Sequence, residues 1–329
     1  MFRFRKAPAA KAPMGSDPSA FIELTRVIKT FRNAAGEYTV LKGIDAAFRE
    51  REFVSIVGRS GSGKSTLLNM MTGIDHPTSG AIRIGGVVLN TMNEGRMSVW
   101  RGRQMGIVFQ FFQLLPMLTL LENVMLPMDF CDMYAPAERE GRAIDLLKMV
   151  GLEGLENKYP AAVAGGQQQS AAVARALAND PPLLVADEPT GNLDSRTAER
   201  VLEIFEEQVA LGKTVLMVTH DNSLANRAQR KLVISDGELV NEAISRAFPD
   251  LRHSVLLKLT RAAKTLRLRP GERAPMPALL VLQSGEAEID DAVLGEGGCR
   301  VRKNNNEEIN ALSALEAVIV ESLPEGVTL

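Results

Sequence analysis

The sequence is poor in cysteine, in net charge and in long apolar runs. Its two cysteines, Cys131 and Cys299, lie far apart, which excludes a disulfide framework and suits a reducing compartment. A net charge of −2 gives no overall attraction to nucleic acid or to an anionic membrane surface. No apolar stretch approaches the roughly 20 residues that a membrane-spanning helix needs. With 329 residues, 45% of them hydrophobic, we expect a globular protein with room for two domains.

The first 20 residues also lack the apolar core of a secretory signal. The segment is basic and rich in alanine and proline, and we predict a disordered N-terminal arm over residues 1–20. Its cations could contact anionic lipid or remain solvated. They are Arg3, Arg5, Lys6 and Lys11.

Apolar runs of strand length alternate with helical stretches over residues 21–247. Leu183–Ala186 and Val215–Val218 are continuously apolar, which is typical of central parallel strands covered on both faces. Pro136–Val150 has the spacing of an amphipathic helix, with proline tolerated in the first turn. The stretch of about 111–180 shows no clear buried strand. We therefore predict an α/β fold with a central, mostly parallel sheet and a helical subdomain over about residues 111–180.

The pattern changes after about Asn241. A basic, helical stretch is followed by a Pro-Gly turn and then by short apolar runs separated by turn residues. We predict a small β-rich second domain over residues 248–329. The segments are the helical stretch Leu256–Leu268, the turn Pro270-Gly271, the strands Ala278–Leu282, Glu286–Ile289 and Ala317–Val320, and the turn Asn304–Asn306.

A glycine-rich turn follows the predicted strand Phe53–Val57 and opens a helix. Such a turn directs backbone N–H groups at an anion, and the start of the helix adds a positive partial charge. Lys64 would reach the β- and γ-phosphates, and the Ser65 hydroxyl would lie on Mg²⁺. The spacing G-x-x-x-x-G-K-S predicts a nucleoside triphosphate site. The turn reads Gly58, Arg59, Ser60, Gly61, Ser62, Gly63, Lys64, Ser65 and Thr66.

Further polar residues follow other predicted strands. Asp187 could orient Mg²⁺ and its waters, and Glu188 could polarise the attacking water as a general base. Taken alone, these two acids could equally be helix N-terminal acids favoured by the helix dipole. Gln110 and His220 each follow an apolar run, so that Gln110 could bind Mg²⁺ or the lytic water and His220 the γ-phosphate. A second glycine-rich segment, Ala164–Gln167, opens the helix that we predict over Gln168–Ala178, and this helix start is again suited to phosphate.

Over about residues 21–247 these motifs resemble an ATP-binding cassette (ABC) ATPase, which implies ATP and Mg²⁺ as cofactors. The resemblance implies that Ser65, Gln110 and Asp187 lie beside the Mg²⁺ ion. It places Phe31 where an aromatic ring stacks on adenine, with Tyr38 as the competing candidate. The matching motifs are Walker A (Gly58–Thr66), Walker B (Leu183–Glu188), the Q-loop (Gln110), the signature (Val163, Ala164, Gly165, Gly166 and Gln167), the D-loop (Gly191, Asn192, Leu193 and Asp194) and the switch histidine (His220).

Within the ABC proteins the chain is most similar to the group that includes LolD, MacB and FtsE. The resemblance rests on Phe109–Thr119, Glu122–Val124 and Leu126-Pro127. It implies a head-to-tail dimer, with an identical or a different second ABC subunit, on a transmembrane permease. It also implies a peripheral location on the cytoplasmic face of the plasma membrane. ABC proteins that act on DNA or ribosomes carry coiled-coil insertions or two cassettes, and we expect no nucleic acid partner.

The chain departs from the family pattern in its signature. Ala164 replaces the usual serine, and Ser170 replaces the usual arginine. Loss of the serine hydroxyl removes one charge-assisted hydrogen bond to the γ-phosphate across the dimer. We therefore expect a slow or asymmetric ATPase. The alternative is a regulatory or structural ABC subunit with weak ATPase activity.

The C-terminal region faintly resembles the start of a cyclic-nucleotide-binding β-roll. The matching pieces are Leu256–Ala263, Leu266–Leu268, Pro270–Glu272 and Leu280–Glu286. However, Arg300 follows Gly295–Gly298 too soon to leave room for the helix of a phosphate cassette. We predict a degenerate β-roll that makes protein contacts, and we do not expect a cyclic nucleotide as a partner.

Overall fold

The computed structural model describes residues 20–34, 36–191, 193–290, 292–303, 307–327 and 329. The predicted N-terminal arm lies outside these ranges apart from Ala20, which begins strand β1. Asn192 of the predicted D-loop and the predicted turn at 304–306 also lie outside them.

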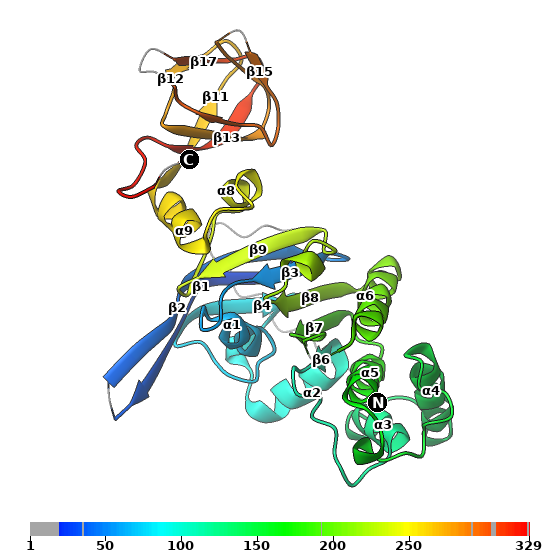
Figure 1. The fold of residues 1–329 in the computed structure, drawn as a ribbon. Helices are drawn as coiled ribbons and strands as arrows, with labels where there is room; N and C mark the ends of the chain where they lie inside the picture. Colours follow the sequence, from blue (N-terminus) through cyan, green and yellow to red (C-terminus); the bar gives the residue numbers. More distant parts are fainter. Residues whose placement is uncertain (1–19, 35, 192, 291, 304–306, 328) are drawn as a thin grey trace.

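A mostly parallel sheet forms the centre of the larger part of the molecule (Figure 1). Only β10 runs antiparallel to its neighbour. The central strands β3 and β8 are buried along their whole length, which explains their continuously apolar sequences. The prediction of a mostly parallel sheet is confirmed. In spatial order the strands are β10 (Glu238–Leu239), β9 (Arg230–Ser235), β3 (Phe53–Val57), β8 (Thr214–Thr219), β7 (Leu183–Asp187) and β6 (Met105–Val108).

A second, antiparallel sheet lies beside the first, and helix α1 (Lys64–Met71) shares a buried cluster with both. Ile22 and Leu41 of this sheet belong to that cluster, together with Leu67 of α1 and Ile56 of β3. Its first two strands form a long hairpin that extends away from the body in Figure 1. The elements are β1 (Ala20–Asn33), β2 (Gly36–Arg49), β4 (Ser79–Ile84), β5 (Val87–Val88) and the short helix η1 (Leu89–Thr91).

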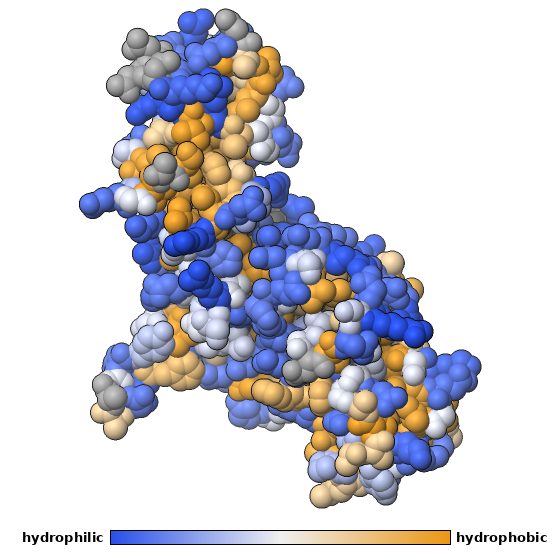
Figure 2. Space-filling model, viewed as in Figure 1, coloured by the Kyte–Doolittle hydropathy of each residue, from blue (hydrophilic) through white to orange (hydrophobic). Residues whose placement is uncertain are grey.

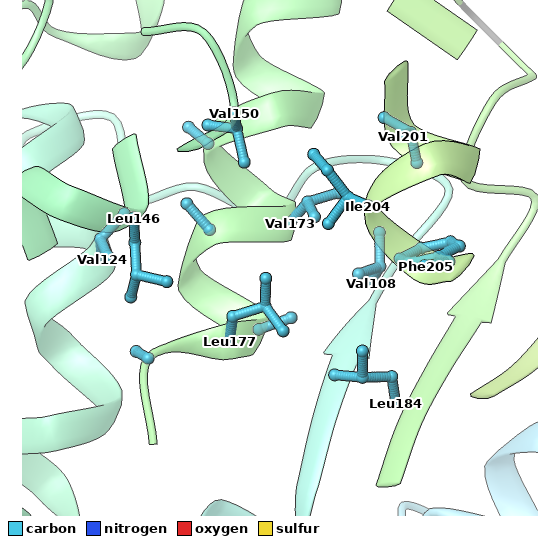
Figure 3. Packing of buried hydrophobic residues seen from close by; sticks show 14 of the residues in the cluster. Val108, Val124, Leu146, Val150, Val173, Leu177, Leu184, Val201, Ile204 and Phe205 are labelled. Carbon is cyan, nitrogen blue, oxygen red and sulfur yellow. The ribbon is translucent and has the colours of Figure 1, made fainter. Parts of the chain in front are cut away.

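The chain between β6 and β7 is helical. Thr119 caps the first of these helices by accepting from the Glu122 N–H at 3.2 Å, while the Glu122 carboxylate accepts from the Thr119 N–H at 2.7 Å. Val173 and Leu177 lie between the other helices and the parallel sheet (Figure 3). The helices are α3 (Leu120–Phe130), α4 (Pro136–Met149), η2 (Pro160–Ala162) and α5 (Gly165–Leu177), and α2 (Glu94–Gln104) precedes β6.

Helix α5 begins three residues earlier than the predicted start at Gln168. The first-turn N–H groups of a helix have no intrahelical partner, so glycine is tolerated there. In addition, the Gln167 side chain accepts a hydrogen bond from the Ala164 N–H at 3.0 Å. The two signature glycines, Gly165 and Gly166, therefore form the first turn of the helix.

In the described part of the chain, four helices follow β7. Asp194, Asp221 and Asn241 cap the first three, each accepting hydrogen bonds from backbone N–H groups in the first turn. The helices are α6 (Ser195–Ala210), α7 (Asn222–Ala225), α8 (Glu242–Ala247) and α9 (His253–Ala262).

After α9, the described residues of the C-terminal region form two antiparallel sheets packed face to face (Figure 1). Leu280 of the first sheet and Ile309 of the second belong to the buried cluster between them. The first sheet has the order β11 (Ala263–Leu268), β18 (Leu315–Val320), β13 (Leu279–Ser284) and β16 (Cys299–Val301). The second has the order β12 (Arg273–Pro275), β17 (Glu308–Ala311), β14 (Ala287–Ile289) and β15 (Ala292–Leu294).

Strand β13 of the first C-terminal sheet is buried on both faces along its apolar run. Leu280 and Leu282 belong to the inner cluster, whereas Leu279 and Val281 belong to a cluster with α8, α9 and the end of β3. Successive side chains of β13 therefore enter the two clusters in turn, which explains why the strand is apolar at every position from Leu279 to Leu282. The predicted boundary near residue 248 falls between α8 and α9, which share this cluster, and the division into domains stays a prediction.

Candidate functional site

The loop between β3 and α1 has a backbone that only glycine adopts easily. Gly61 and Gly63 have φ values of 78° and 104°, in the left-handed region that favours glycine. A Cβ on Gly58 would lie 2.4 Å from the Ile234 carbonyl oxygen. The glycines of the motif are thus required by backbone conformation and by close packing.

Lys64, the first residue of α1, is held within this loop. Its Nζ donates to the Gly58 carbonyl at 2.8 Å and to the Arg59 carbonyl at 3.2 Å. The side chain is buried, whereas Ser65 beside it is exposed. The loop therefore presents an ammonium group, a hydroxyl and a helix N-terminus together, a combination suited to phosphate.

Asp187 ends β7 beside this loop. Its Oδ1 is buried and has no hydrogen-bond partner among the described residues. Burial raises the pKa of Asp187, and the Glu188 carboxylate acts in the same direction, whereas the Ser65 hydroxyl and the Lys64 ammonium oppose the rise. A buried carboxylate oxygen without a partner beside a serine hydroxyl is a donor set that suits a hard divalent cation.

Glu188 and His220 form a pair at the same edge of the sheet. The His220 Nδ1 lies 2.7 Å from the Glu188 Oε2, and the Glu188 side chain is only 11% exposed while that of His220 is 68% exposed. Glu188 has a φ of 47°, and its N–H donates to the Val218 carbonyl at 2.9 Å. A non-glycine residue held in this strained conformation is typical of functional sites.

The signature residues lie elsewhere, beside the start of α6. A Cβ on Gly166 would lie 3.5 Å from the Thr197 side chain and 3.8 Å from the Asp194 Oδ2. Asp194 accepts from the Thr197 hydroxyl at 2.6 Å and from two N–H groups of α6, and these hydrogen bonds lower its pKa. Ala164 and Gly165 are exposed. The signature and Asp194 thus form a second, separate group.

Gln110 lies two residues beyond β6 and is exposed. The segment after it is attached to α5, because Arg175 donates to the Phe112 carbonyl at 2.8 Å and to the Gln113 carbonyl at 2.6 Å. The Phe112 ring also lies 3.7 Å from a Cβ built on Gly165. This role of Arg175 was not predicted from the sequence, because a single arginine within a helix belongs to no recognisable motif.

The two candidates for adenine stacking lie opposite each other. Phe31 pairs with Tyr38 in the register of β1 and β2, and the two are 45% and 64% exposed. The Lys29 Nζ lies 4.9 Å from the centroid of the Phe31 ring. Both rings remain candidates.

Sequence reasoning also missed a turn that closes on the phosphate loop. The Gly237 N–H donates to the Ser62 carbonyl at 3.0 Å, and the Gly237 carbonyl accepts from the Lys42 N–H at 2.9 Å. A Cβ on Gly237 would lie 2.1 Å from the Val40 carbonyl oxygen. The Asp-Gly dipeptide signals a turn, but its packing partner cannot be read from the sequence.

Comparisons with known proteins agree with this geometry. A model of the ABC transporter family matches residues 41–191. The uncharacterized ABC transporter ATP-binding protein MJ0796 of Methanocaldococcus jannaschii is 43% identical over 233 residues, which cover 70% of this chain and 99% of that protein. The chain belongs to the ABC transporter ATP-binding family. It is therefore an ATP-binding ATPase, and the predicted ABC ATPase fold is confirmed.

The chain is also similar to a LolD protein and to a solved structure of a dimeric cassette. The lipoprotein-releasing system ATP-binding protein LolD of Aquifex aeolicus is 46% identical over 206 residues, covering 62% of this chain and 91% of that protein. A solved dimeric structure of MJ0796, in a post-hydrolysis state with ADP and Pi, has a TM-score of 0.64 at 42% identity. The match covers 66% of this chain and 96% of the MJ0796 chain.

Among the described residues, no helix is both long enough and apolar enough to span a membrane.

We predict that Gly237→Ala lowers the affinity for ATP, because the new methyl group must displace either Val40 or the turn that holds Ser62. Gly271→Ala is the matched control, since Gly271 has a similar φ of 82° but no atom within 4 Å of its Cβ position. In both variants an alanine must adopt a positive φ, which costs about 1 kcal/mol, so this cost cancels in the comparison. Nucleotide titration should show at least a several-fold weaker affinity for Gly237→Ala alone, and equal affinities in the two variants would contradict the assignment.

Proposed function

We propose that this chain is the ATP-hydrolysing subunit of an ABC transporter complex that couples ATP-driven dimerisation to a membrane permease. The permease would be of the lipoprotein-release or macrolide-export type. The observation that carries the proposal is the Glu188–His220 pair at 2.7 Å, which lies at the sheet edge beside the loop that holds Lys64. The similarity to LolD supports the choice of permease.

The phosphates of ATP would lie on the loop Gly58–Thr66. Ser65, Asp187 and Gln110 would hold Mg²⁺, which when bound neutralises charge on the β- and γ-phosphate oxygens. The partnerless Oδ1 of Asp187 supports this assignment. The adenine would stack on Phe31 or on Tyr38.

Glu188 would act as the general base. Its carboxylate is placed by the strained backbone at φ 47° and by the contact with His220. A base in this position accepts a proton from the attacking water as the oxygen approaches the γ-phosphate. His220 is exposed and would orient both the carboxylate and the γ-phosphate.

A second ABC subunit, identical or different, would complete the site. Ala164–Gln167 and Asp194 lie together and apart from the phosphate loop, so a nucleotide on that loop would meet them only on a second subunit. The exposed N-terminus of α5 offers free backbone N–H groups to a phosphate. A head-to-tail dimer would bring the two groups face to face.

The permease would dock in a groove of about 650 Å³ between α2, β6, α3 and α5. Phe130 at its rim is 80% exposed, and Phe111 and Met117 nearby in the chain are 72% and 78% exposed. Figure 2 shows apolar surface over the helical part of the molecule. Such exposed apolar side chains mark interaction sites. Arg101 and Arg175 also line the groove, so an apolar helix with acidic flanks would fit it. Through this contact the chain would lie on the cytoplasmic face of the plasma membrane.

A regulatory or structural ABC subunit with weak ATPase activity is the second candidate. It is favoured by Ala164, whose methyl group cannot donate a hydrogen bond to a phosphate. The N–H groups of Gly165 and Gly166 remain, so we expect a weakened contribution to the partner's site.

Glu188→Gln should lower kcat by about 10²–10⁴-fold, because an amide cannot accept the proton from water. ATP binding should be retained. Glu203→Gln on the exposed face of α6 is the control and should leave kcat unchanged. Phosphate release and nucleotide titration measure the two quantities, and a kcat within threefold of the parent would refute Glu188 as the base.

Ala164→Ser should raise kcat, because one charge-assisted hydrogen bond contributes about 1.5–3 kcal/mol, or roughly ten- to a hundred-fold. Ala162→Ser, also exposed but outside the signature, should have no effect. Turnover of the purified chain and of its complex gives the comparison. No increase in either preparation would show that the signature argument is wrong.

Phe130→Ser should abolish retention of the permease while leaving the ATPase activity of the isolated chain unchanged, since Phe130 contributes little to the core. Leu211→Ser is the control, because Leu211 is 74% exposed at the end of α6. Both tagged full-length variants would be incubated with detergent-solubilised membranes containing the permease, and the bound permease quantified. Equal retention by the two variants would exclude this groove.

A further inference from the structure

The turn between β9 and β10 lies between the phosphate loop and the C-terminal region. On one side, the Gly237 N–H donates to the Ser62 carbonyl at 3.0 Å. On the other side, Arg261 of α9 makes two contacts with the Glu238 carboxylate, at 2.5 Å and 3.3 Å. One guanidinium from the C-terminal region thus holds a turn that holds the phosphate loop.

The same turn is fixed to β2. The Lys42 Nζ lies 2.7 Å from the Asp236 Oδ2, and Arg261 lies 3.8 Å from the same atom. The Lys42 N–H also donates to the Gly237 carbonyl at 2.9 Å. Arg261 therefore joins a network that fixes the turn from two directions, and a planar guanidinium is well suited to such a two-point contact.

Two further observations relate the start of α9 to the phosphate loop. Val57, the residue before Gly58, shares a buried cluster with Leu256 and Leu257 of α9. His253, at the start of α9, has its pKa lowered by burial and by the nearby positive charges of Arg59, Lys231 and Lys64. Helix α9 therefore shares a buried cluster with the residue that enters the phosphate loop, and its first residue lies near the charges of that loop.

The backbone N–H groups of a phosphate loop bind well only when they converge on one anion. A contact that fixes the loop from outside changes its affinity for phosphate in both the ground state and the transition state. It should therefore change KM and leave kcat unaltered.

We propose that Arg261 is a positioning residue for the phosphate loop, through which the C-terminal region sets the affinity for ATP. Through Glu238, the first residue of β10, the guanidinium holds the turn Asp236-Gly237 against Ser62. The C-terminal region thereby acts on the nucleotide site through this turn, without supplying a residue to the phosphate loop.

The test uses Arg261→Gln in the full-length chain. Because exposed ion pairs contribute little, the expected rise in the KM for ATP is about two- to five-fold, with kcat unchanged and a matching rise in the dissociation constant for ATP. Arg267→Gln is the control, since Arg267 pairs with Glu316 at 2.9 Å in the same C-terminal region but lies away from the turn.

Glu238→Gln should give the same rise in KM, and the double variant with Arg261→Gln should add nothing further, because both changes break one contact. Glu238→Gln also replaces Arg261→Gln if the latter fails to fold. Three results would overturn the proposal: an unchanged KM, an equal rise in Arg267→Gln, or a loss in kcat with KM unaltered.

Discussion

The geometry of one short loop constrains much of the molecule. The backbone N–H groups between Gly58 and Lys64 can converge on an anion only because Gly61 and Gly63 adopt left-handed conformations. Close packing of Gly58 on Ile234 fixes the loop on β9. Since β3, β7 and β8 run parallel, their carboxyl ends meet at one edge, and Asp187, Glu188 and His220 come beside the loop. A parallel sheet thus gathers these groups from distant parts of the sequence.

Local patterns in the sequence predicted the elements that depend on local physics. Continuous apolar runs identified β7 and β8, and the glycine spacing identified the loop before α1. The positions of Asp187 and His220 at strand ends followed from the same runs. Contacts between distant segments could not be predicted: Arg175 on the carbonyl of Phe112 and Gly237 on the carbonyl of Ser62 carry no pattern in one sequence. The early start of α5 was missed because glycine is ordinarily unfavourable in helices.

The C-terminal region is joined to the ATPase fold by packing on one face of its first sheet. Leu279 and Val281 of β13 lie in the cluster that contains Val57, and Leu280 and Leu282 lie in the inner cluster. Close packing transmits small shifts across such clusters. Helix α9, which the sequence assigned to a separate domain, shares this cluster with Val57, the residue before the phosphate loop. The structure shows the strand-rich C-terminal region that the sequence predicted, and the β-roll resemblance stays a prediction.

We propose that two groups of residues, separate in one subunit, enclose one magnesium-bound triphosphate across a dimer. A crystal structure of the full-length chain with Mg²⁺ and a non-hydrolysable ATP analogue tests this most directly. We predict phosphates on the loop N–H groups, Glu188 and His220 facing the γ-phosphate, and Gly165 and Gly166 of a second subunit opposite. A lone protomer with the analogue bound elsewhere, or with the loop unoccupied, would contradict the account.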